Sequence, residues 1–260
     1  MATRLGAHSP RLSRVRALRT SKGRAEQGRF AFEGATLLRE ARAGAFVVEE
    51  LFVTPEAYEA TPLVAETEAA GTPVYLVPPG AFRQLSSLTT PAGILAVAAS
   101  RHSELRAIVG GPSPVLVLAD LGDPANAGTL LRSADAFGCT GVVFGSHGIE
   151  PYHPKVVRGS MGAVFRLEVA VAGPDELRAA ATAAGLRLLG LDTRGSELAH
   201  ELGQGPGALI IGHERHGLGR WKECCDALVA IPMRGRAESL SAGVAGSIAL
   251  FEATRTRSRQ

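Results

Sequence analysis

The segment PVLVLADLGDPANAGTLLRSADAFG, residues 114–138, contains an uninterrupted apolar run, a short polar loop and then a helical pattern. Similar apolar runs recur toward the C-terminus, and helical stretches such as DELRAAATAAG (175–185) lie between them. Strands that are apolar throughout are buried on both faces, which is typical of a parallel sheet covered by helices. The sequence therefore predicts a doubly wound parallel-sheet α/β domain over residues 114–260. Its expected strands lie within PVLVLAD (114–120), GVVF (141–144), VFRLEVAV (164–171), LRLLGLD (186–192), ALIIG (208–212) and ALVAIPM (227–233).

A smaller α/β pattern precedes this domain. Its expected strands lie within RFAFEG (29–34), VEELFV (48–53), PVYLV (73–77) and GILAVA (93–98). Helices are expected at LLREARA (37–43) and in a polar stretch near residues 56–70. The charged and then Gly/Pro-rich residues 101–113 are typical of a linker. We therefore expect an N-terminal domain at 1–100, a linker at 101–113 and the parallel-sheet domain at 114–260.

The composition is that of a globular protein. The 260 residues are 45% hydrophobic and 20% charged. No apolar run approaches the ~18 residues of a membrane span, and the N-terminus has no apolar secretion signal. The three cysteines, two of them adjacent, form neither a disulfide framework nor a zinc-ligand pattern. A soluble protein of the reducing cytoplasm, without a metal, is expected.

The charge is concentrated at the N-terminus. Residues 1–30 contain eight of the 28 Lys and Arg residues but only one acidic residue, Glu26, which gives this segment +7 and the rest of the chain −4. A basic arm of this kind is expected to bind a polyanion, because each cation that neutralises a phosphate releases a counterion. The alternatives are an organelle transit peptide and a helix with a solvated basic face. The candidate RNA-binding residues are Arg11, Arg14, Arg16, Arg19, Lys22 and Arg24.

Doubly wound sheets bind ligands beyond the carboxyl ends of their strands, so the loops after the apolar runs are the candidate site. The first loop, DLGDPANAG (120–128), has no G-x-G-x-x-G, and the chain has no P-loop, which disfavours nucleotide hydride or phosphoryl chemistry. Asn126 is the only asparagine in the protein. It could cap a helix that begins near Ala127 or belong to a site. Arg132, one helical turn after Gly128, could bind a phosphate bidentately, through two of its guanidinium N–H groups.

Two later loops are also rich in polar or small residues. GHERHGL (212–218) places Glu214 at the end of an apolar strand, either in a ligand site or in a charged surface turn. In IPMRGRAESLSAGVAGSIALFE (231–252), Ser239 could cap a final helix running from about Ser239 to Arg257. The small residues of that helix form a face that another backbone can approach closely. They are Ser241, Ala242, Gly243, Ala245, Gly246 and Ser247.

Taken together, NAGTLLR (126–132), GHERHGL (212–218) and IPM (231–233) followed by ESL (238–240) resemble the three ordered motifs of the SPOUT superfamily. The match is to its TrmH branch, the S-adenosylmethionine-dependent RNA ribose 2′-O-methyltransferases. The resemblance covers residues 114–257, and the upstream residues are similar to the small α/β RNA-binding domain that precedes the catalytic domain in many of these enzymes.

The resemblance implies a deep trefoil knot, a homodimer, and an RNA 2′-O-methyltransferase that uses S-adenosylmethionine. Arg132 would bind the RNA phosphate and stabilise developing alkoxide charge, since a guanidinium has no lone pair with which to accept a proton. Asn126 and Ser239 would orient the ribose and its phosphate, and Glu214 would hold the arginine or a loop backbone. The residues implied to contact the cofactor, largely through backbone groups, are Leu191, Asp192, Thr193, Gly212, Ile231, Met233 and Leu240.

The chain departs from the family pattern in the third motif, where Ser241 stands in place of the usual asparagine. His213 and His216 also occupy positions where other residues are commoner. Large-subunit ribosomal RNA is the expected substrate and transfer RNA the alternative. A second interpretation is a catalytically silent RNA-binding dimer, and the serine at position 241 keeps this interpretation open. Binding of S-adenosylmethionine would distinguish the enzyme from a protein that has lost its cofactor.

Overall fold

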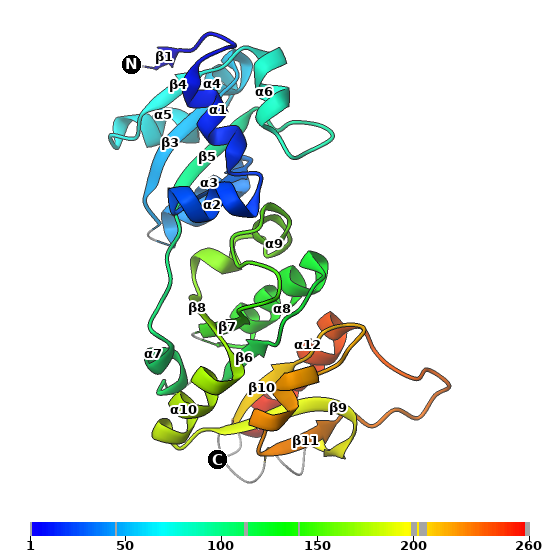
Figure 1. The fold of residues 1–260 in the computed structure, drawn as a ribbon. Coiled ribbons are helices and arrows are strands. Elements are labelled where there is room, and N and C mark those ends of the chain that lie inside the picture. The colour runs from blue at the N-terminus through cyan, green and yellow to red at the C-terminus, as the bar shows by residue number, and fades with distance from the viewer. Residues whose placement is uncertain are drawn as a thin grey trace. The chain divides into compact units, whose positions relative to one another are not determined.

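A computed structural model describes residues 2–44, 46–111, 114–139, 141–198, 202 and 207–257. The chain divides into two compact units, which we describe separately (Figure 1). Unit 1 comprises residues 1–100 and 152–165, and unit 2 comprises residues 101–151 and 166–260.

Unit 1 is built on a mixed five-stranded sheet with the order β1-β4-β3-β5-β2. Strand β5 pairs antiparallel with β2 and β3, whereas β4 pairs parallel with β1 and β3. The strands are β1 (Thr3–Arg4), β2 (Arg29–Glu33), β3 (Val48–Val53), β4 (Val74–Leu76) and β5 (Ile94–Ala99). The helices are α1 (Pro10–Ala17), α2 (Ser21–Gln27), α3 (Ala35–Ala43), α4 (Pro55–Ala60), α5 (Pro62–Ala69), α6 (Pro79–Leu85) and α9 (Pro154–Gly159), with the short 3-10 helix η1 (Ala163–Phe165).

The stretch expected to form one helix near residues 56–70 forms two, α4 and α5. Thr61, between them, has an extended backbone with φ −118° and ψ 98°. Pro62 explains the break, because proline cannot donate to the preceding turn and disfavours a helical conformation in the residue before it.

The expectation of a basic N-terminal arm is wrong, because residues 2–27 are folded into unit 1. Strand β1 pairs with β4, and α1 buries Leu12 and Val15 in the core of the unit. Arg24 is only 5% exposed and its guanidinium donates to the carbonyl of Leu18 at 3.0 Å, so it cannot contact RNA in this fold. Arg11 pairs with Glu50 and lies over the ring of Tyr75. The exposed candidates that remain are Arg14, Arg16, Arg19 and Lys22.

Residues 152–165 pack with unit 1, although the sequence places them between two strands of the other unit. The ring of Tyr152 stacks on Phe30 with centroids 4.4 Å apart, and Phe165 lies 5.0 Å from Phe32. The unit boundaries therefore differ from the single division expected between residues 100 and 114. The expected linker differs too, because its helix α7 (Leu105–Val109) buries Ile108 and Val109 in unit 2. Residues 112 and 113 of that linker lie outside the described residues.

Unit 2 contains the expected parallel α/β sheet. Its six strands are all parallel and have the order β11-β9-β10-β6-β7-β8. Buried side chains such as Val117, Val143 and Ile210 form the core. The strands are β6 (Val115–Leu118), β7 (Gly141–Gly145), β8 (Glu168–Ala172), β9 (Arg187–Glu197), β10 (Gly207–Ile211) and β11 (Ala227–Ala230). Besides α7, the helices are α8 (Pro124–Ala136), α10 (Pro174–Ala184) and α12 (Ala242–Arg257), with the 3-10 helix η2 (Gly219–Cys224).

The final helix begins at Ala242, later than expected, and Ser239 does not cap it. The hydroxyl of Ser241 instead accepts a hydrogen bond from the backbone N–H of Val244 at 3.3 Å, as an N-cap residue does. The small-residue face of α12 does permit a close approach: a Cβ at Gly246 would overlap Leu130 of α8, and the hydroxyls of Ser247 and Ser133 are 2.7 Å apart.

Candidate functional site

The three sequence motifs meet where the strand order of unit 2 changes direction. From β6 the chain builds outward through β7 and β8, and then crosses to the other side of β6 to form β9, β10 and β11. Strands β6 and β10 are direct neighbours, with Leu118 opposite Ile211. Ligands of doubly wound sheets bind at such a switch point, beyond the carboxyl ends of the strands.

Glu214 links the loop after β10 to the loop after β6. Its carboxylate accepts hydrogen bonds from the backbone N–H groups of Gly122 and Asp123, each at 3.2 Å, and from the Nδ2 amide of Asn126 at 2.9 Å. Partial burial raises the pKa of Glu214, but these hydrogen bonds outweigh burial and hold the pKa below its ordinary value. Glu214 is therefore an ionised carboxylate that holds a loop backbone in place.

Asn126 extends this connection to the last helix. Its Oδ1 accepts a hydrogen bond from the backbone N–H of Gly243 at 3.2 Å, while its Nδ2 donates to Glu214. The N-cap of α8 is Asp123, whose carboxylate accepts from the N–H of Ala125 at 2.8 Å. The alternative that Asn126 merely caps a helix is therefore wrong, and its amide joins three segments that are far apart in sequence.

The GHERHGL segment forms a tight hairpin. His213 and Gly217 exchange both backbone hydrogen bonds at 2.8 Å. Gly217 has φ +60°, and a Cβ at Gly212 would overlap the backbone of Gly217 and Leu218. The two glycines thus shape a turn that directs Glu214 toward the β6 loop, while Arg215 and His216 are exposed.

A cavity of about 350 Å³ lies beside this turn, within the ~300–1,000 Å³ that small-molecule sites occupy. All seven residues expected to contact a cofactor line it, and so does Ser239. The other lining residues are Ile211, His213, Glu214, Gly217, Val229, Ala230, Ser241, Ala242 and Ala245. The lining combines aliphatic side chains with polar residues, and it comes from the middle of β9, from the ends of β10 and β11 and from the segments that follow these two strands. Such a lining suits a ligand with both apolar and polar parts.

Arg132 lies on α8 and is exposed, and its side chain makes no hydrogen bond or ion pair with any other described residue. Glu214 and Asn126 bond to each other and to loop backbone, so the structure does not join Arg132 to Glu214. Its guanidinium is available to a ligand. Asp192 at the cavity wall is paired with Arg194 and Lys222, and the hydrogen bonds from Arg194 lower its pKa.

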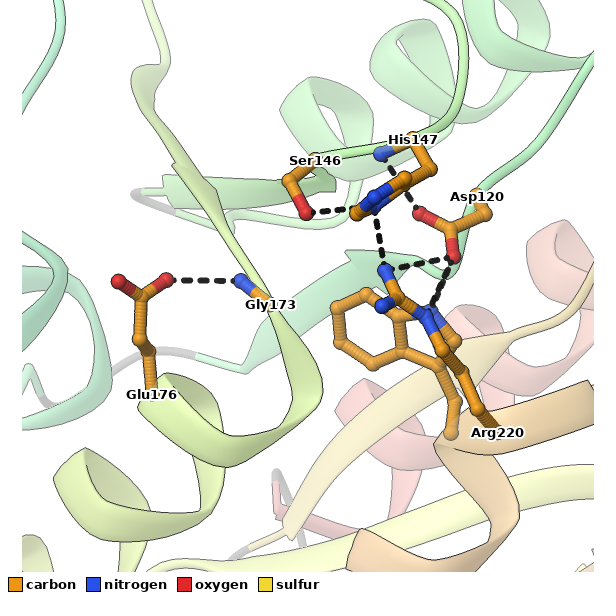
Figure 2. A network of polar contacts seen from close by, with 7 residues as sticks. Asp120, Ser146, His147, Gly173, Glu176 and Arg220 are labelled. Carbon is orange, nitrogen blue, oxygen red and sulfur yellow. Dashed lines mark hydrogen bonds and ion pairs between the residues drawn. The ribbon is translucent and has the colours of Figure 1, made fainter.

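A second polar network adjoins the site and was not expected from the sequence. Figure 2 shows Asp120, at the end of β6, beside His147 and Arg220. The carboxylate of Asp120 accepts from Trp221 Nε1 at 2.8 Å and from the N–H of His147 at 3.0 Å. Burial raises the pKa of Asp120, but the hydrogen bonds from Trp221 and His147 and the charge of Arg220 together lower it. Asp120 has φ +53°, so this network fixes a strained residue two positions before Gly122, which donates to Glu214.

No group of three or more His, Cys, Asp or Glu side chains among the described residues could hold a metal ion. In the same part of the chain, no helix combines the length and the apolar character that crossing a membrane requires.

Comparison with known proteins identifies the family. Residues 113–251 match the SpoU rRNA Methylase family. The chain belongs to this family. Residues 9–96, which lie in unit 1, match a second domain family, the MRM3-like substrate binding domain. The resemblance to methyltransferases of this type that the three motifs implied is confirmed.

Relatives of this SpoU family member have named activities. It is 30% identical over 240 residues to the 23S rRNA (guanosine(2553)-2′-O)-methyltransferase RlmP of Bacillus subtilis, covering 90% of this chain and 92% of that protein. It is 40% identical over 144 residues to the 23S rRNA (uridine(2479)-2′-O)-methyltransferase of Streptomyces viridochromogenes, covering 52% of this chain. That match and those to several mycobacterial relatives span only about half of the relatives' own length. The crystal structure of an AdoMet-bound rRNA methyltransferase from Sinorhizobium meliloti is similar, with a TM-score of 0.87 and 28% identity over 98% of each chain.

Proposed function

We propose that this chain is an S-adenosylmethionine-dependent RNA ribose 2′-O-methyltransferase that acts on large-subunit ribosomal RNA. The observation that carries the proposal is that the second and third motif loops line one cavity, while the hydrogen bond from Asn126 to Glu214 joins the first motif loop to its edge. The named activities of the relatives from Bacillus and Streptomyces support the choice of RNA. The cysteines, which form no disulfide, are compatible with the cytoplasm as its location.

The cavity fits the proposed cofactor, because its size and mixed lining suit a molecule with an adenine, a ribose and an amino acid part. When bound, S-adenosylmethionine supplies a sulfonium methyl group that a ribose 2′-oxygen attacks. The residues that would hold it are Leu191, Asp192, Thr193, Gly212, Ile231, Met233 and Leu240. At Gly212 only glycine permits the backbone approach that shapes the wall.

Arg132 is the candidate catalytic residue. Its free guanidinium can bind an RNA phosphate through two N–H groups and stabilise the negative charge that develops on the 2′-oxygen. It cannot accept the hydroxyl proton, because it has no lone pair at neutral pH. Ser239, exposed at the cavity, offers a hydroxyl that can orient the ribose.

Asn126 and Glu214 act mainly by positioning. The Oδ1 of Asn126 accepts a hydrogen bond from Gly243, and one N–H of its Nδ2 amide donates to Glu214. One amide N–H is left to donate to a ribose or a phosphate. We therefore assign to this pair the task of keeping the β6 loop, the β10 loop and the start of α12 in one arrangement.

The proposed assembly is a homodimer. Helix α12 exposes Val244, Ile248 and Phe251, which are 47%, 40% and 50% accessible and recur at i, i+4 and i+7 on one face. The ring of Phe137, the residue that directly follows α8, lies 5.9 Å from the ring of Phe251 between centroids and extends this face. An apolar stripe of this kind is typical of a helix that packs on another chain.

Two further parts of the proposal concern topology and RNA. We propose that the segments around β9, β11 and α12 form the trefoil knot of the family; the tight fit of Gly195 against the backbone of Leu228 and Val229 is compatible with it. We also propose that unit 1 binds RNA through its exposed cations Arg14, Arg16, Arg19 and Lys22.

The test is methyl transfer by the purified protein. Incubation with isotopically labelled S-adenosylmethionine and a 23S rRNA transcript should yield a labelled 2′-O-methylnucleoside after digestion, with no loss of activity in EDTA. A parallel reaction with total transfer RNA distinguishes the alternative substrate. Label on a base, or binding of RNA without binding of S-adenosylhomocysteine, would refute the proposal, and the latter result would favour the silent RNA-binding dimer.

A further inference from the structure

Eleven of the thirteen arginines that the structure describes in unit 2, all except Arg187 and Arg257, fall into two groups. In one group each guanidinium is paired with a carboxylate. These ion pairs join Arg101 to Glu168, Arg166 to Asp135, Arg178 to Asp226, Arg194 to Asp192, Arg220 to Asp120 and Arg255 to Glu252. In the other group the guanidinium is exposed and has no hydrogen bond or ion pair to any described residue. This group consists of Arg106, Arg132, Arg215, Arg234 and Arg236.

Three of the free arginines, Arg215, Arg234 and Arg236, adjoin cavity residues in the sequence. Arg132 belongs to α8, which carries Asn126, and Arg215 lies in the hairpin between the cavity residues Glu214 and Gly217. Arg234 and Arg236 follow the cavity residue Met233. Arg106, on α7, and Arg132 do not adjoin a lining residue in the sequence. Exposed guanidiniums without a carboxylate partner in the loops that line the cavity make a surface that suits a phosphate chain.

The segment 232–240, between β11 and α12, carries two of these arginines. It is exposed along its whole length and makes no hydrogen bond to any other described residue. Figure 1 shows the connection between β11 and α12 standing away from the body of unit 2. Glu238 is its single carboxylate, so the segment has a net charge of +1.

The same segment also forms part of the cavity wall. Met233, next to Arg234, and Leu240 both line the cavity. The two residues are 37% and 38% exposed, which is high for large apolar residues and leaves surface for a ligand to cover. One short segment without internal hydrogen bonds thus has cations directed to solvent and apolar groups at the cavity.

We infer that Arg215, Arg234 and Arg236 form a second RNA phosphate-binding surface, separate from unit 1, and that segment 232–240 couples this contact to cofactor binding. Phosphates held by Arg234 and Arg236 restrict the segment. The segment that carries Met233 and Leu240 has then already lost conformational entropy before the cofactor enters. Cofactor binding loses less entropy in consequence, so the cofactor binds more tightly. Linkage requires the reverse effect as well, so cofactor increases RNA affinity by the same factor. This inference rests on the proposed function, because it takes RNA as the polyanion.

The test compares the double variant Arg234→Ala/Arg236→Ala with the wild-type protein. The probe is a fluorescently labelled 23S rRNA fragment, and its affinity is measured at several salt concentrations. Loss of two phosphate contacts should reduce the slope of log K against log salt by about 1.4, at ~0.7 per contact for single-stranded RNA. The control Arg106→Ala/Arg178→Ala removes the same charge from α7 and α10, which pack on each other, and should leave the slope unchanged.

The coupling is measured with S-adenosylhomocysteine, which binds without turnover. RNA should tighten its binding to the wild-type protein by about 5-fold or more, the lower end of typical coupling between sites. The double variant should bind it normally without RNA and lose the RNA effect. A wild-type slope or a retained RNA effect in the double variant overturns the inference. Competition by polyglutamate as strong as that by RNA also overturns it, because the surface would then suit an acidic protein. Failure of the proposed function gives a different result, namely no methyl transfer by the wild-type protein.

Discussion

Replacing Glu214 by alanine tests whether its carboxylate holds the site together. The change removes one acceptor from three donors, the N–H groups of Gly122 and Asp123 and the amide of Asn126, at 2.9–3.2 Å. At about 0.5–1.5 kcal/mol for each bond, the three contribute about 1.5–4.5 kcal/mol. We expect Glu214→Ala to lower the free energy of unfolding by about 2 kcal/mol, because the side chain is 22% exposed and water can replace some of the lost hydrogen bonds.

The loss should lower the Tm of unit 2 by roughly 4–8 °C. Trp221 is the single tryptophan and is buried in unit 2, so its fluorescence reports the unfolding of this unit alone. Glu214→Gln should recover only part of the lost stability. Glutamine keeps one acceptor oxygen, but its amide nitrogen replaces the other and cannot accept a hydrogen bond from an N–H group. Glu104→Ala, an exposed glutamate without a side-chain partner among the described residues, is the control.

The effect should depend on pH in a defined direction. The folded pKa of Glu214 lies below its ordinary value of ~4.3, so its contribution is present above that value and is lost as pH falls through the lowered pKa. The difference in Tm between wild type and Glu214→Ala should therefore be full at neutral pH and shrink in acid. A difference below about 1 °C at neutral pH, or one that persists unchanged in acid, would refute the assigned role.

Three further outcomes are expected. Arg132→Ala should lose at least ~100-fold in kcat while binding S-adenosylhomocysteine normally, and Arg132→Lys should recover little, because a point charge cannot replace two N–H groups at a phosphate; steady-state kinetics near wild type would contradict this. Ile248→Glu should produce a monomer of about half the dimer mass in sedimentation and lose activity, whereas a persisting dimer would exclude the α12 face as the interface. Ser241→Ala should destabilise unit 2 by about 1 kcal/mol in urea unfolding and Ser241→Asn should not, because asparagine caps helices as well as serine; equal loss in both would rule out the cap.

The parallel sheet of unit 2 was predictable because each strand is a continuous apolar run. The run VLVL of β6 and the run ALII of β10 occupy their expected places. The site could be located for the same reason, since parallel strands bring their carboxyl ends, and hence the loops at Asn126 and Glu214, to one edge.

Other features depend on contacts that local patterns do not encode. The charge count at the N-terminus predicted an arm, yet Leu12, Val15 and Leu18 are buried; their spacing of three residues was the available signal for packed helices. No local signal places Tyr152 against Phe30, because the two residues are remote in sequence. The same holds for Asp120, whose partner Trp221 is about a hundred residues away.

The exchange of asparagine for serine at position 241 has a physical explanation. Ser241 keeps a side-chain oxygen at the start of α12, and that oxygen caps the helix whose Gly243 bonds to Asn126. The departure therefore preserves the link between the third motif and the first. This supports activity over a silent RNA-binding role.

The most direct measurement is a map of ribose methylation in the ribosomal RNA of cells that contain or lack this protein. The proposed function predicts that one 2′-O-methyl group of the large-subunit RNA disappears when the gene is deleted. It returns when the wild-type chain is supplied and does not return with Arg132→Ala. Identical ribose methylation in the RNA of both cell types, or the loss of a base methyl group instead, would contradict the account.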